Sequence, residues 1–441
     1  MKLFRGIFIA AKIGIRREDK NEWERRVPLI PEHVKEFKEK YGIETIIQPS
    51  KIRVYSDNEY SNVGTIVQED LSSCPTIFAV KEIPIDFFEP KKTYVFFSHT
   101  IKGQKYNMPM LKKMMELECN LIDYEKIVNE KGFRLVFFGR FAGLAGMIDT
   151  LWAFGQRMKS KGIDSPFNEI KQTINYKKHL PEIKEHLKNI RKKIEQDGIP
   201  KSLTPVIVGF AGYGNVSKGA QEILDILPVK EISPKKIKMI FDNPSDNCIY
   251  KVVFKEEDMV EPISPHDTFE LQDYYKHPEK YKSVFEKYVP YLTILMNCIY
   301  WDGKYPRLVT KEFLKNTDQE NLKLQVIGDI SVDINGAIEI TEKSTDPDDP
   351  VYVYDPITDT ITDGCSGDGV VIMAVDNLPC ELPRESSHEF SNSLYDFVSE
   401  IAKADFTQDF DDLTLSLPIK KAVVLYHGKL TPEYRYIDKY L

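Results

Sequence analysis

Short apolar runs alternate with amphipathic segments along most of this chain. Buried strands are predicted at 8–15, 43–48, 76–80, 94–97, 135–138 and 206–210. The helix predicted over 31–41 places Val34 and Phe37 on one face and ends at Gly42. This alternation is typical of an α/β fold with parallel sheets, whose ligands gather at the carboxyl ends of the strands. Residues that directly follow the apolar runs are therefore the first candidates for chemistry.

A change in composition divides the chain. Residues 170–200 are rich in Lys, Glu and Ile and predict one or two solvated helices before a second α/β unit. The formal net charge of −8 indicates no general attraction to nucleic acid. The six cysteines form no Cys-x-x-Cys pair, so neither a disulfide framework nor a metal site is expected. No apolar run reaches the roughly 18 residues of a membrane span, and residues 1–15 favour a strand over a signal peptide.

A glycine-containing turn follows the strand predicted at 206–210 and precedes a helix predicted at 217–227. Its pattern is Gly-x-Gly-x-x-Ser in the strand–turn–helix context of dinucleotide-binding proteins. Gly212 allows the tight turn, and Gly214 lets the backbone approach a pyrophosphate at the helix N-terminus. A plain tight turn is the alternative interpretation. The candidate cofactor residues here are Gly212, Tyr213, Gly214, Asn215, Val216 and Ser217.

The residue that contacts the ribose 2′ group of the cofactor is expected at the end of the next strand, which is predicted at 229–232. Ser233 occupies that end, with Lys235 and Lys236 close behind it. A small hydroxyl beside two cations accepts a 2′-phosphate without charge repulsion, whereas NAD sites usually place an acidic residue there. The sequence therefore favours NADP(H), with NAD(H) as the alternative.

Charged and titratable residues also gather in three segments of the N-terminal third, at 24–29, 80–84 and 97–102. Lys81 stands beside Glu82, an arrangement in which burial can tune an amine for proton transfer. Histidine can act as an acid or a base near neutral pH, which makes His99 a candidate, and Arg26 offers a planar fork for a carboxylate. Simple salt bridges between loops are the alternative interpretation.

Several segments together resemble the lysine–2-oxoglutarate reductase domain, which forms the N-terminal half of aminoadipic semialdehyde synthase. They cover nearly the whole chain, at 14–29, 96–102, 121–126, 139–147, 212–220, 275–281 and 376–379. The wider superfamily includes saccharopine dehydrogenase, alanine dehydrogenase and transhydrogenase. The resemblance implies two Rossmann-like α/β domains with parallel sheets. A catalytic domain of residues 1–138 and 329–441 would enclose an inserted NAD(P)-binding domain of residues 139–328, with the substrates in the cleft between them.

The resemblance also implies roles for single residues. Lys81 and His99 match the acid–base pair of the superfamily, and Arg26 matches its substrate-carboxylate arginine. Asp329 matches an acidic residue that serves both substrate and nicotinamide. The remaining matches are Glu82, Lys102, Glu125 and Arg134 for the substrates, and Asn297, Cys298 and Ile299 for the nicotinamide ring.

The activity implied by the resemblance is reductive condensation of L-lysine with 2-oxoglutarate to saccharopine, in lysine degradation. The alternatives are an NAD-dependent, L-lysine-forming saccharopine dehydrogenase and a nucleotide-binding homologue without turnover. The expected partners are these small molecules, with neither nucleic acid nor a membrane, and a homo-oligomer is compatible with the sequence. The expected location is the cytoplasm, with the mitochondrion as the alternative.

Overall fold

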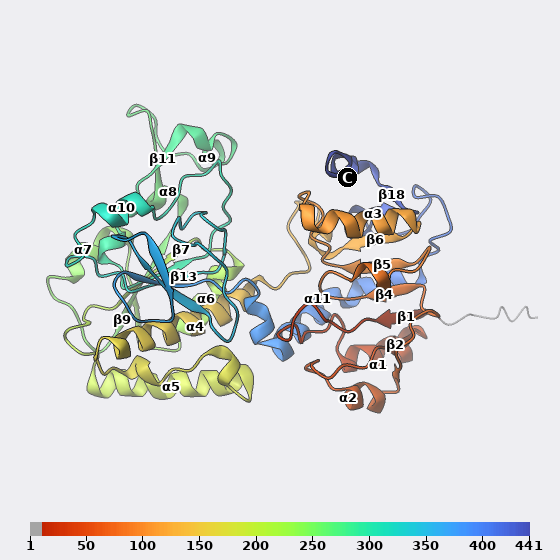
Figure 1. Ribbon diagram of the computed structural model, residues 1–441, viewed down its shortest axis with the longest axis horizontal. Helices are drawn as coiled ribbons and strands as arrows, with labels where there is room; N and C mark the ends of the chain where they lie inside the picture. Colours follow the sequence, from red (N-terminus) through yellow and green to blue (C-terminus); the bar gives the residue numbers. More distant parts are fainter. Residues whose placement is uncertain (1–10) are drawn as a thin grey trace, which may run out of the picture. The chain divides into compact units, whose positions relative to one another are not determined.

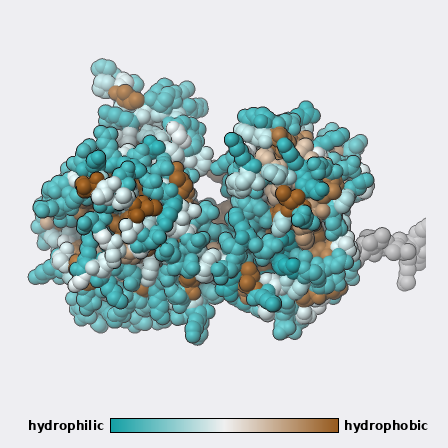
Figure 2. Space-filling model, in the orientation of Figure 1, coloured by the Kyte–Doolittle hydropathy of each residue, from teal (hydrophilic) through white to brown (hydrophobic). Residues whose placement is uncertain are grey.

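The structure, a computed structural model, describes residues 11–441 and contains two compact units. One unit joins residues 11–138 to 383–441, and the other holds residues 139–382 (Figure 1). The visible surfaces of both are mainly hydrophilic (Figure 2). Residues 8–10 of the first predicted strand lie outside the described residues, and the remainder of that run contains β1.

The first unit is built on an eight-stranded sheet in the order β18-β17-β6-β5-β4-β1-β2-β3. The strands from β6 to β3 are parallel, whereas β17 runs antiparallel to β6 and β18. The runs predicted at 43–48, 76–80 and 94–97 are confirmed as β2, β4 and β5. The strands are β1 (Lys12–Ile15), β2 (Glu44–Ile47), β3 (Ile66–Val67), β4 (Thr76–Phe78), β5 (Thr93–Phe96), β6 (Asn120–Asp123), β17 (Val423–Tyr426) and β18 (Lys429–Leu430).

Helices from both ends of the chain pack together in this unit. The predicted helix 31–41 is confirmed as α1, and Gly42 ends it with a φ of 68°, a conformation that suits glycine. Phe37 of α1 stacks on Tyr395 of α11 at 4.9 Å between ring centroids. The helices are α1 (Pro31–Tyr41), α2 (Asp57–Asn62), α3 (Met108–Glu116), α11 (Pro383–Lys403) and α12 (Leu417–Ala422), with 3₁₀ segments at Ile85–Phe87, Lys105–Asn107, Tyr124–Lys126 and Pro432–Tyr440.

The prediction of a strand at 135–138 is wrong. These residues form an irregular connection that leads into the second unit. Phe138 stacks on Phe390 of α11, with ring centroids 4.4 Å apart and planes within 8°. The apolar run is therefore explained by side-chain packing instead of sheet pairing.

The second unit contains another eight-stranded sheet, in the order β15-β14-β16-β13-β12-β7-β9-β8. The strands from β16 to β8 are parallel, and β14 runs antiparallel to both β15 and β16. A separate antiparallel pair is formed by β10 and β11. The strands are β7 (Ile207–Ala211), β8 (Val229–Glu231), β9 (Ile249–Phe254), β10 (Val260–Pro262), β11 (Tyr281–Ser283), β12 (Ile294–Asn297), β13 (Val326–Asp329), β14 (Val351–Asp355), β15 (Thr360–Asp363) and β16 (Val370–Met373).

Two helices of this unit pack backbone against backbone. A Cβ on Gly143 of α4 would stand 1.9 Å from the Val216 carbonyl oxygen of α6, and one on Gly219 would stand 2.1 Å from that of Arg140. Glycine at both positions is therefore required for this close approach. The helices are α4 (Gly139–Ser160), α5 (His179–Asp197), α6 (Asn215–Leu224), α7 (Ile237–Ile240), α8 (Glu256–Met259), α9 (Leu271–Lys276) and α10 (Lys311–Asn316), with 3₁₀ segments at Pro166–Glu169, Thr173–Asn175, Pro234–Lys236, Pro278–Lys280, Phe285–Lys287, Val289–Tyr291 and Leu378–Glu381.

The first expected domain boundary, after residue 138, falls where the first unit ends, but the return at 329 needs correction. β13 pairs with β12, bringing Asn297 and Asp329 into register, and β16 and β14 extend the same sheet. Residues 329–382 therefore share the hydrogen bonding of the second unit. The chain re-enters the first unit at Pro383, where α11 begins.

Candidate functional site

Three parallel strands of the first unit are each followed by a titratable side chain. Glu18, Lys81 and His99 lie three residues beyond the ends of β1, β4 and β5. Because parallel strands end at one edge of their sheet, the following segments converge there. Glu82 joins the group, with its Oε1 atom 2.7 Å from Nδ1 of His99 and its Oε2 atom 3.1 Å from Nζ of Lys20.

Glu82 remains ionised in these surroundings. Burial alone would raise the pKa of its carboxyl, but the hydrogen bond and charge of His99 and the charge of Lys20 hold that pKa well below the usual range. An ionised Glu82 accepts the Nδ1 proton of His99 and leaves Nε2 of the ring for another partner. The pair resembles the oriented base of general acid–base catalysis.

Lys81 is half-buried within this group. Burial lowers the pKa of its amine, and the charges of Arg26 and Lys20 act in the same direction. Glu24 and Glu82 oppose them. An amine with a lowered pKa exchanges protons more readily near neutral pH than an exposed lysine does.

Glu18 holds the backbone of the Lys81 segment and was missed by sequence reasoning. Its carboxylate accepts hydrogen bonds from the N–H groups of Val80 at 2.7 Å and Lys81 at 3.0 Å. Burial, with the nearby charge of Glu24, raises its pKa to about 7. Its place three residues after a strand, which Lys81 and His99 share, is the signal that could have found it.

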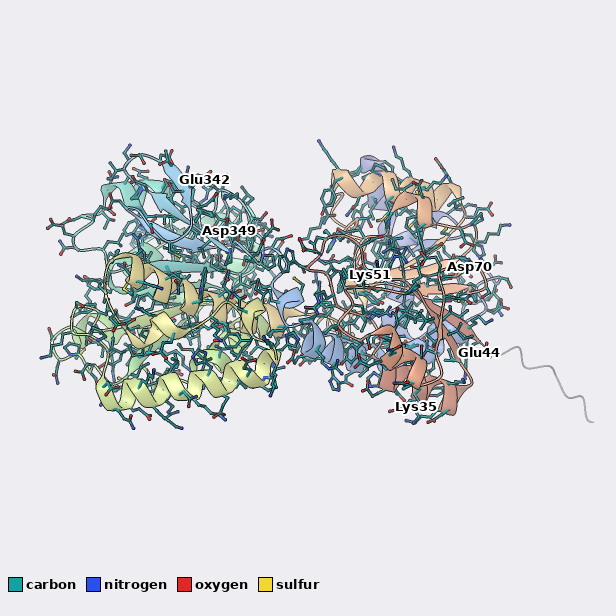
Figure 3. The ribbon with its side chains drawn as sticks, turned by 60° about the horizontal axis from the view of Figure 1, so that its bottom comes forward. Lys35, Glu44, Lys51, Asp70, Glu342 and Asp349 are labelled. Carbon is teal, nitrogen blue, oxygen red and sulfur yellow. The ribbon has the colours of Figure 1, made fainter. Side chains whose placement is uncertain are left out.

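Arg26 is buried and paired. Its Nε atom donates to Glu24 Oε1 at 2.7 Å, its terminal nitrogen contacts Glu24 Oε2, and its guanidinium lies 4.3 Å from the ring centroid of Phe138. The exposed fractions of the Arg26 and Glu24 side chains are 1% and 0%. By contrast, Lys35 and Lys51, labelled in Figure 3, are exposed. Charged side chains are rarely buried without a partner, so the ion pair with Glu24 explains how Arg26 can be buried.

The His99 backbone is held in an unusual conformation. Its φ is 48°, a left-handed value that is costly for a residue with a Cβ. Asn107 Nδ2 donates to the carbonyl oxygens of Ser98 at 3.0 Å and His99 at 3.2 Å. Asp123 accepts from the Ser98 N–H at 3.0 Å and also binds the Ser98 hydroxyl. The surrounding hydrogen bonds therefore impose this turn on His99.

The other predicted substrate residues of this unit are Glu125, Arg134 and Lys102. Glu125, capped by Asp123 through its N–H at 2.7 Å, forms an ion pair with Arg134. The Arg134 side chain is 49% exposed, and Lys102 is also exposed.

The predicted phosphate turn of the second unit has the expected local geometry. β7 leads into Gly212, whose φ of 93° is readily available to glycine alone. A Cβ on Gly214 would meet nothing within 4 Å, and α6 starts at Asn215 without a side-chain cap. The N–H groups of the first turn of α6 therefore face an open approach, as a pyrophosphate requires. Within this turn Ser217 is buried, whereas Tyr213 is exposed.

The strand beside β7 is not the one predicted. β9 pairs with β7, and β8 pairs with the far side of β9 at the edge of the sheet. Ser233 therefore follows an edge strand, and the structural reason for placing it at the 2′ position fails. Glu256, two residues beyond β9, takes the corresponding place and was missed because the sequence order suggested the wrong neighbour.

Asn297 and Asp329 lie together at the ends of β12 and β13. Asn297 Nδ2 donates to Asp329 Oδ1 at 2.9 Å, and the Thr341 hydroxyl donates to Oδ2 at 2.6 Å. Burial raises the pKa of Asp329 to about 6. The Oδ1 atom of Asn297 is buried without a protein donor, so it is available to an N–H group of a ligand.

A cavity of about 430 Å³ adjoins the phosphate turn. Gly212 and Gly214 line it together with Cys298 and Ile299. Burial raises the pKa of the Cys298 thiol, which therefore stays protonated and is a poor nucleophile. The open turn, the cavity and the orphaned oxygen of Asn297 fit a dinucleotide. Among residues 11–441, no group of three or more His, Cys, Asp and Glu side chains is placed to hold a metal ion.

Residues 364–369 form a glycine-rich loop that contacts α4. Buried Arg157 of α4 donates to the carbonyl oxygens of Cys365 at 3.0 Å, Gly367 at 2.6 Å and Gly369 at 2.8 Å. The loop therefore presents carbonyl oxygens to a protein cation.

None of the helices formed by residues 11–441 is both long and apolar enough to cross a lipid bilayer.

Comparison with known proteins finds family matches in both the N-terminal and the C-terminal parts of the chain. Residues 14–145 match the alanine dehydrogenase/PNT N-terminal domain family, and residues 266–433 match its C-terminal domain family. The chain is 37% identical to the alpha-aminoadipic semialdehyde synthase of Arabidopsis thaliana over 97% of its own length and 41% of that protein. It is also 37% identical to the mitochondrial enzyme of that name from Bos taurus, over 99% of this chain and 48% of that protein.

Two further relatives match along nearly their whole length. An NAD(+), L-lysine-forming saccharopine dehydrogenase of Emericella nidulans is 26% identical, over 87% of this chain and 90% of that protein. A solved L-alanine dehydrogenase has the same fold, with a TM-score of 0.62 and 17% identity over 97% of this chain and 99% of that one. The chain spans less than half the length of the semialdehyde synthases that it matches. The two domain matches and these relatives show that the chain belongs to the alanine dehydrogenase/PNT superfamily of NAD(P)-linked oxidoreductases.

Proposed function

We propose that the chain is a lysine–2-oxoglutarate reductase that condenses L-lysine with 2-oxoglutarate and reduces the product to saccharopine. The carrying observation is the Lys81, Glu82 and His99 group at the carboxyl edge of the first sheet. The similarity to aminoadipic semialdehyde synthases supports the choice of substrates. The reaction needs an amine deprotonated, water expelled and an imine reduced, and these residue types serve the first two steps.

The first steps are proton transfers at the substrate amine. Lys81, in its neutral form, or Nε2 of His99 removes a proton from the ε-ammonium of lysine. The freed amine attacks the keto carbon, and the resulting carbinolamine loses water when the protonated partner donates to its hydroxyl. Glu82 keeps the His99 ring oriented throughout, because it accepts the Nδ1 proton at 2.7 Å. Lys81 and His99 can each serve as the base or the acid in these steps.

A bound nicotinamide would supply hydride to the carbon of the imine C=N bond, and a proton added to the nitrogen would complete saccharopine. Asn297 and Asp329 would hold the carboxamide side of the nicotinamide through hydrogen bonds. That the substrates are enclosed in a cleft between the two units remains a prediction.

Substrate binding is assigned by charge. Arg26, assisted by Lys102 or Arg134, binds carboxylates through charge-assisted hydrogen bonds. Because Arg26 is paired with Glu24, a substrate carboxylate would share its guanidinium with Glu24. Glu125, with its carboxylate at the same sheet edge, would attract a substrate ammonium.

The predicted cellular location is the cytoplasm, with the mitochondrion as the alternative.

The test is an assay of the purified chain with lysine, 2-oxoglutarate and either NADH or NADPH, followed by the loss of reduced-nicotinamide absorbance. Lys81→Met removes the amine and is expected to lower kcat by about 10²-fold or more. Lys35→Met, which removes an exposed lysine of α1, is the matched control and should leave kcat unchanged. An active Lys81→Met variant would remove Lys81 from the chemistry.

The alternatives give different results in the same assay. A nucleotide-binding homologue without turnover would bind reduced cofactor but consume none. An NAD-dependent saccharopine dehydrogenase would catalyse the same chemistry with NADH in preference to NADPH. The expectation of NADP(H) rested on Ser233, whose strand lies at the sheet edge, and the residue that replaces it in the fold is acidic.

A further inference from the structure

Glu256 stands at the place where dinucleotide-binding folds distinguish their cofactors. β9 is the strand beside β7, and Glu256 begins α8 just after β9 ends. In such folds the side chain at the end of this neighbouring strand meets the adenosine ribose. Glu256 lines the same cavity as Gly212 and Gly214 of the phosphate turn. Both the strand order and the lining of the cavity therefore place Glu256 at the candidate cofactor site.

Two tyrosines hold the Glu256 carboxylate. The Tyr213 hydroxyl, from the phosphate turn itself, donates to Oε2 at 3.1 Å, and the Tyr275 hydroxyl donates to Oε1 at 2.6 Å. Both tyrosines also line the cavity. The carboxylate is thus fixed beside the turn and retains further acceptor positions for ligand hydroxyls.

Lys255 precedes Glu256, and two further acidic residues come after it. Glu257 and Asp258 follow it in the first turn of α8. Arg307 is the one cationic side chain among the described residues that line the cavity, and it donates to the carbonyl oxygens of Gly336 at 3.1 Å and Asn335 at 3.0 Å. Among the described residues that line the cavity, a 2′-phosphate would therefore meet a carboxylate and no uncommitted cation, whereas a 2′-hydroxyl could donate to the carboxylate.

We propose that Glu256 selects NAD(H) over NADP(H) by accepting hydrogen bonds from the ribose hydroxyls and repelling a 2′-phosphate. The inference rests on the proposed condensation of lysine with 2-oxoglutarate, and it assigns that chemistry to the NAD-linked form of the enzyme, which was the alternative there. Its test does not depend on which amino acid or keto acid is reduced, since dinucleotide binding can be measured without them.

The test measures binding of NADH and NADPH to the full chain by the fluorescence of the reduced nicotinamide. The wild-type chain is expected to bind NADH about tenfold more tightly or better, because like charges within hydrogen-bond distance repel strongly near a protein surface. Glu256→Gln removes the charge and keeps the size of the side chain. It should tighten NADPH binding about tenfold and weaken NADH binding, so that the preference largely disappears.

Glu257→Gln is the matched control, because it removes the same charge from the adjacent exposed residue, which does not line the cavity. It should change the ratio of the two dissociation constants little. Competition by 5′-ADP against 2′,5′-ADP repeats the comparison without the nicotinamide. A wild-type preference for NADPH, equal effects of the two variants or no binding of either dinucleotide would overturn the proposal. Selective NADH binding without turnover would instead refute the reductase activity and leave the role of Glu256 standing.

Discussion

The contact between α4 and α6 gives a quantitative test of how the phosphate turn is supported. Gly143→Ala adds one methyl group, whose carbon would lie 1.9 Å from the Val216 carbonyl oxygen. Protein Cβ atoms essentially never approach within 3.0 Å, so the two helices must separate by roughly 1 Å or more. The opposing atom belongs to backbone and cannot rotate away as a side chain could.

Overpacking of this kind costs about 3 kcal/mol, the upper part of the usual range, because the neighbour is rigid. For a chain of 441 residues, that loss corresponds to a fall in Tm of roughly 3 °C. Because α6 begins in the phosphate turn, NADH binding should weaken as well. Thermal unfolding followed by circular dichroism and a titration with NADH measure the two effects.

Gly303→Ala is the control for the substitution itself, since a Cβ there would meet nothing within 4 Å. It should leave both the Tm and the affinity for NADH near the wild-type values. If Gly143→Ala unfolds at the same temperature as this control, the close packing of α4 against α6 is refuted. If it unfolds earlier but binds NADH normally, the link between that packing and the phosphate turn is refuted.

Two further predictions concern the first unit. Ser98→Ala removes the hydroxyl that binds Asp123 and should lower kcat about tenfold, because the strained turn at His99 would loosen. NADH binding should not change. An unaltered kcat would show that the Ser98–Asp123 hydrogen bond does not hold His99 in place for catalysis. Burial raises the pKa of Glu18 to about 7, so its ionisation in the folded state costs stability, and the free energy of unfolding should fall as pH rises from about 4.5 to 7. Glu18→Gln should flatten this pH dependence in urea unfolding experiments, and an unchanged slope would contradict the assignment.

Much of the local structure and chemistry followed from the sequence. The helix over 31–41, the short strands of the first sheet and the turn at Gly212 depend on neighbouring residues, whose spacing and backbone preferences are visible in the chain. The pairing of Lys81, Glu82 and His99 at one edge also followed, because parallel strands place their carboxyl ends together.

Other features depended on contacts between residues far apart in the chain. The apolar run at 135–138 looked like a strand, but it packs its Phe138 ring on Phe390, some 250 residues later. Glu18 and Glu24 gave no local sign of burial, yet the fold places them against Lys81 and Arg26. Such pairings are set by long-range packing, which hydrophobic periodicity does not encode.

The sequence by itself determined that the chain alternates strands and helices, carries a dinucleotide turn and ends several strands with titratable side chains. Only the tertiary structure decided that β9, and not β8, lies beside β7, that residues 329–382 belong to the second unit, and that Glu256, not Ser233, follows the strand beside β7. The reason is that a strand's own residues specify its extended backbone, whereas its neighbour is chosen by hydrogen bonds and packing with segments distant in the sequence.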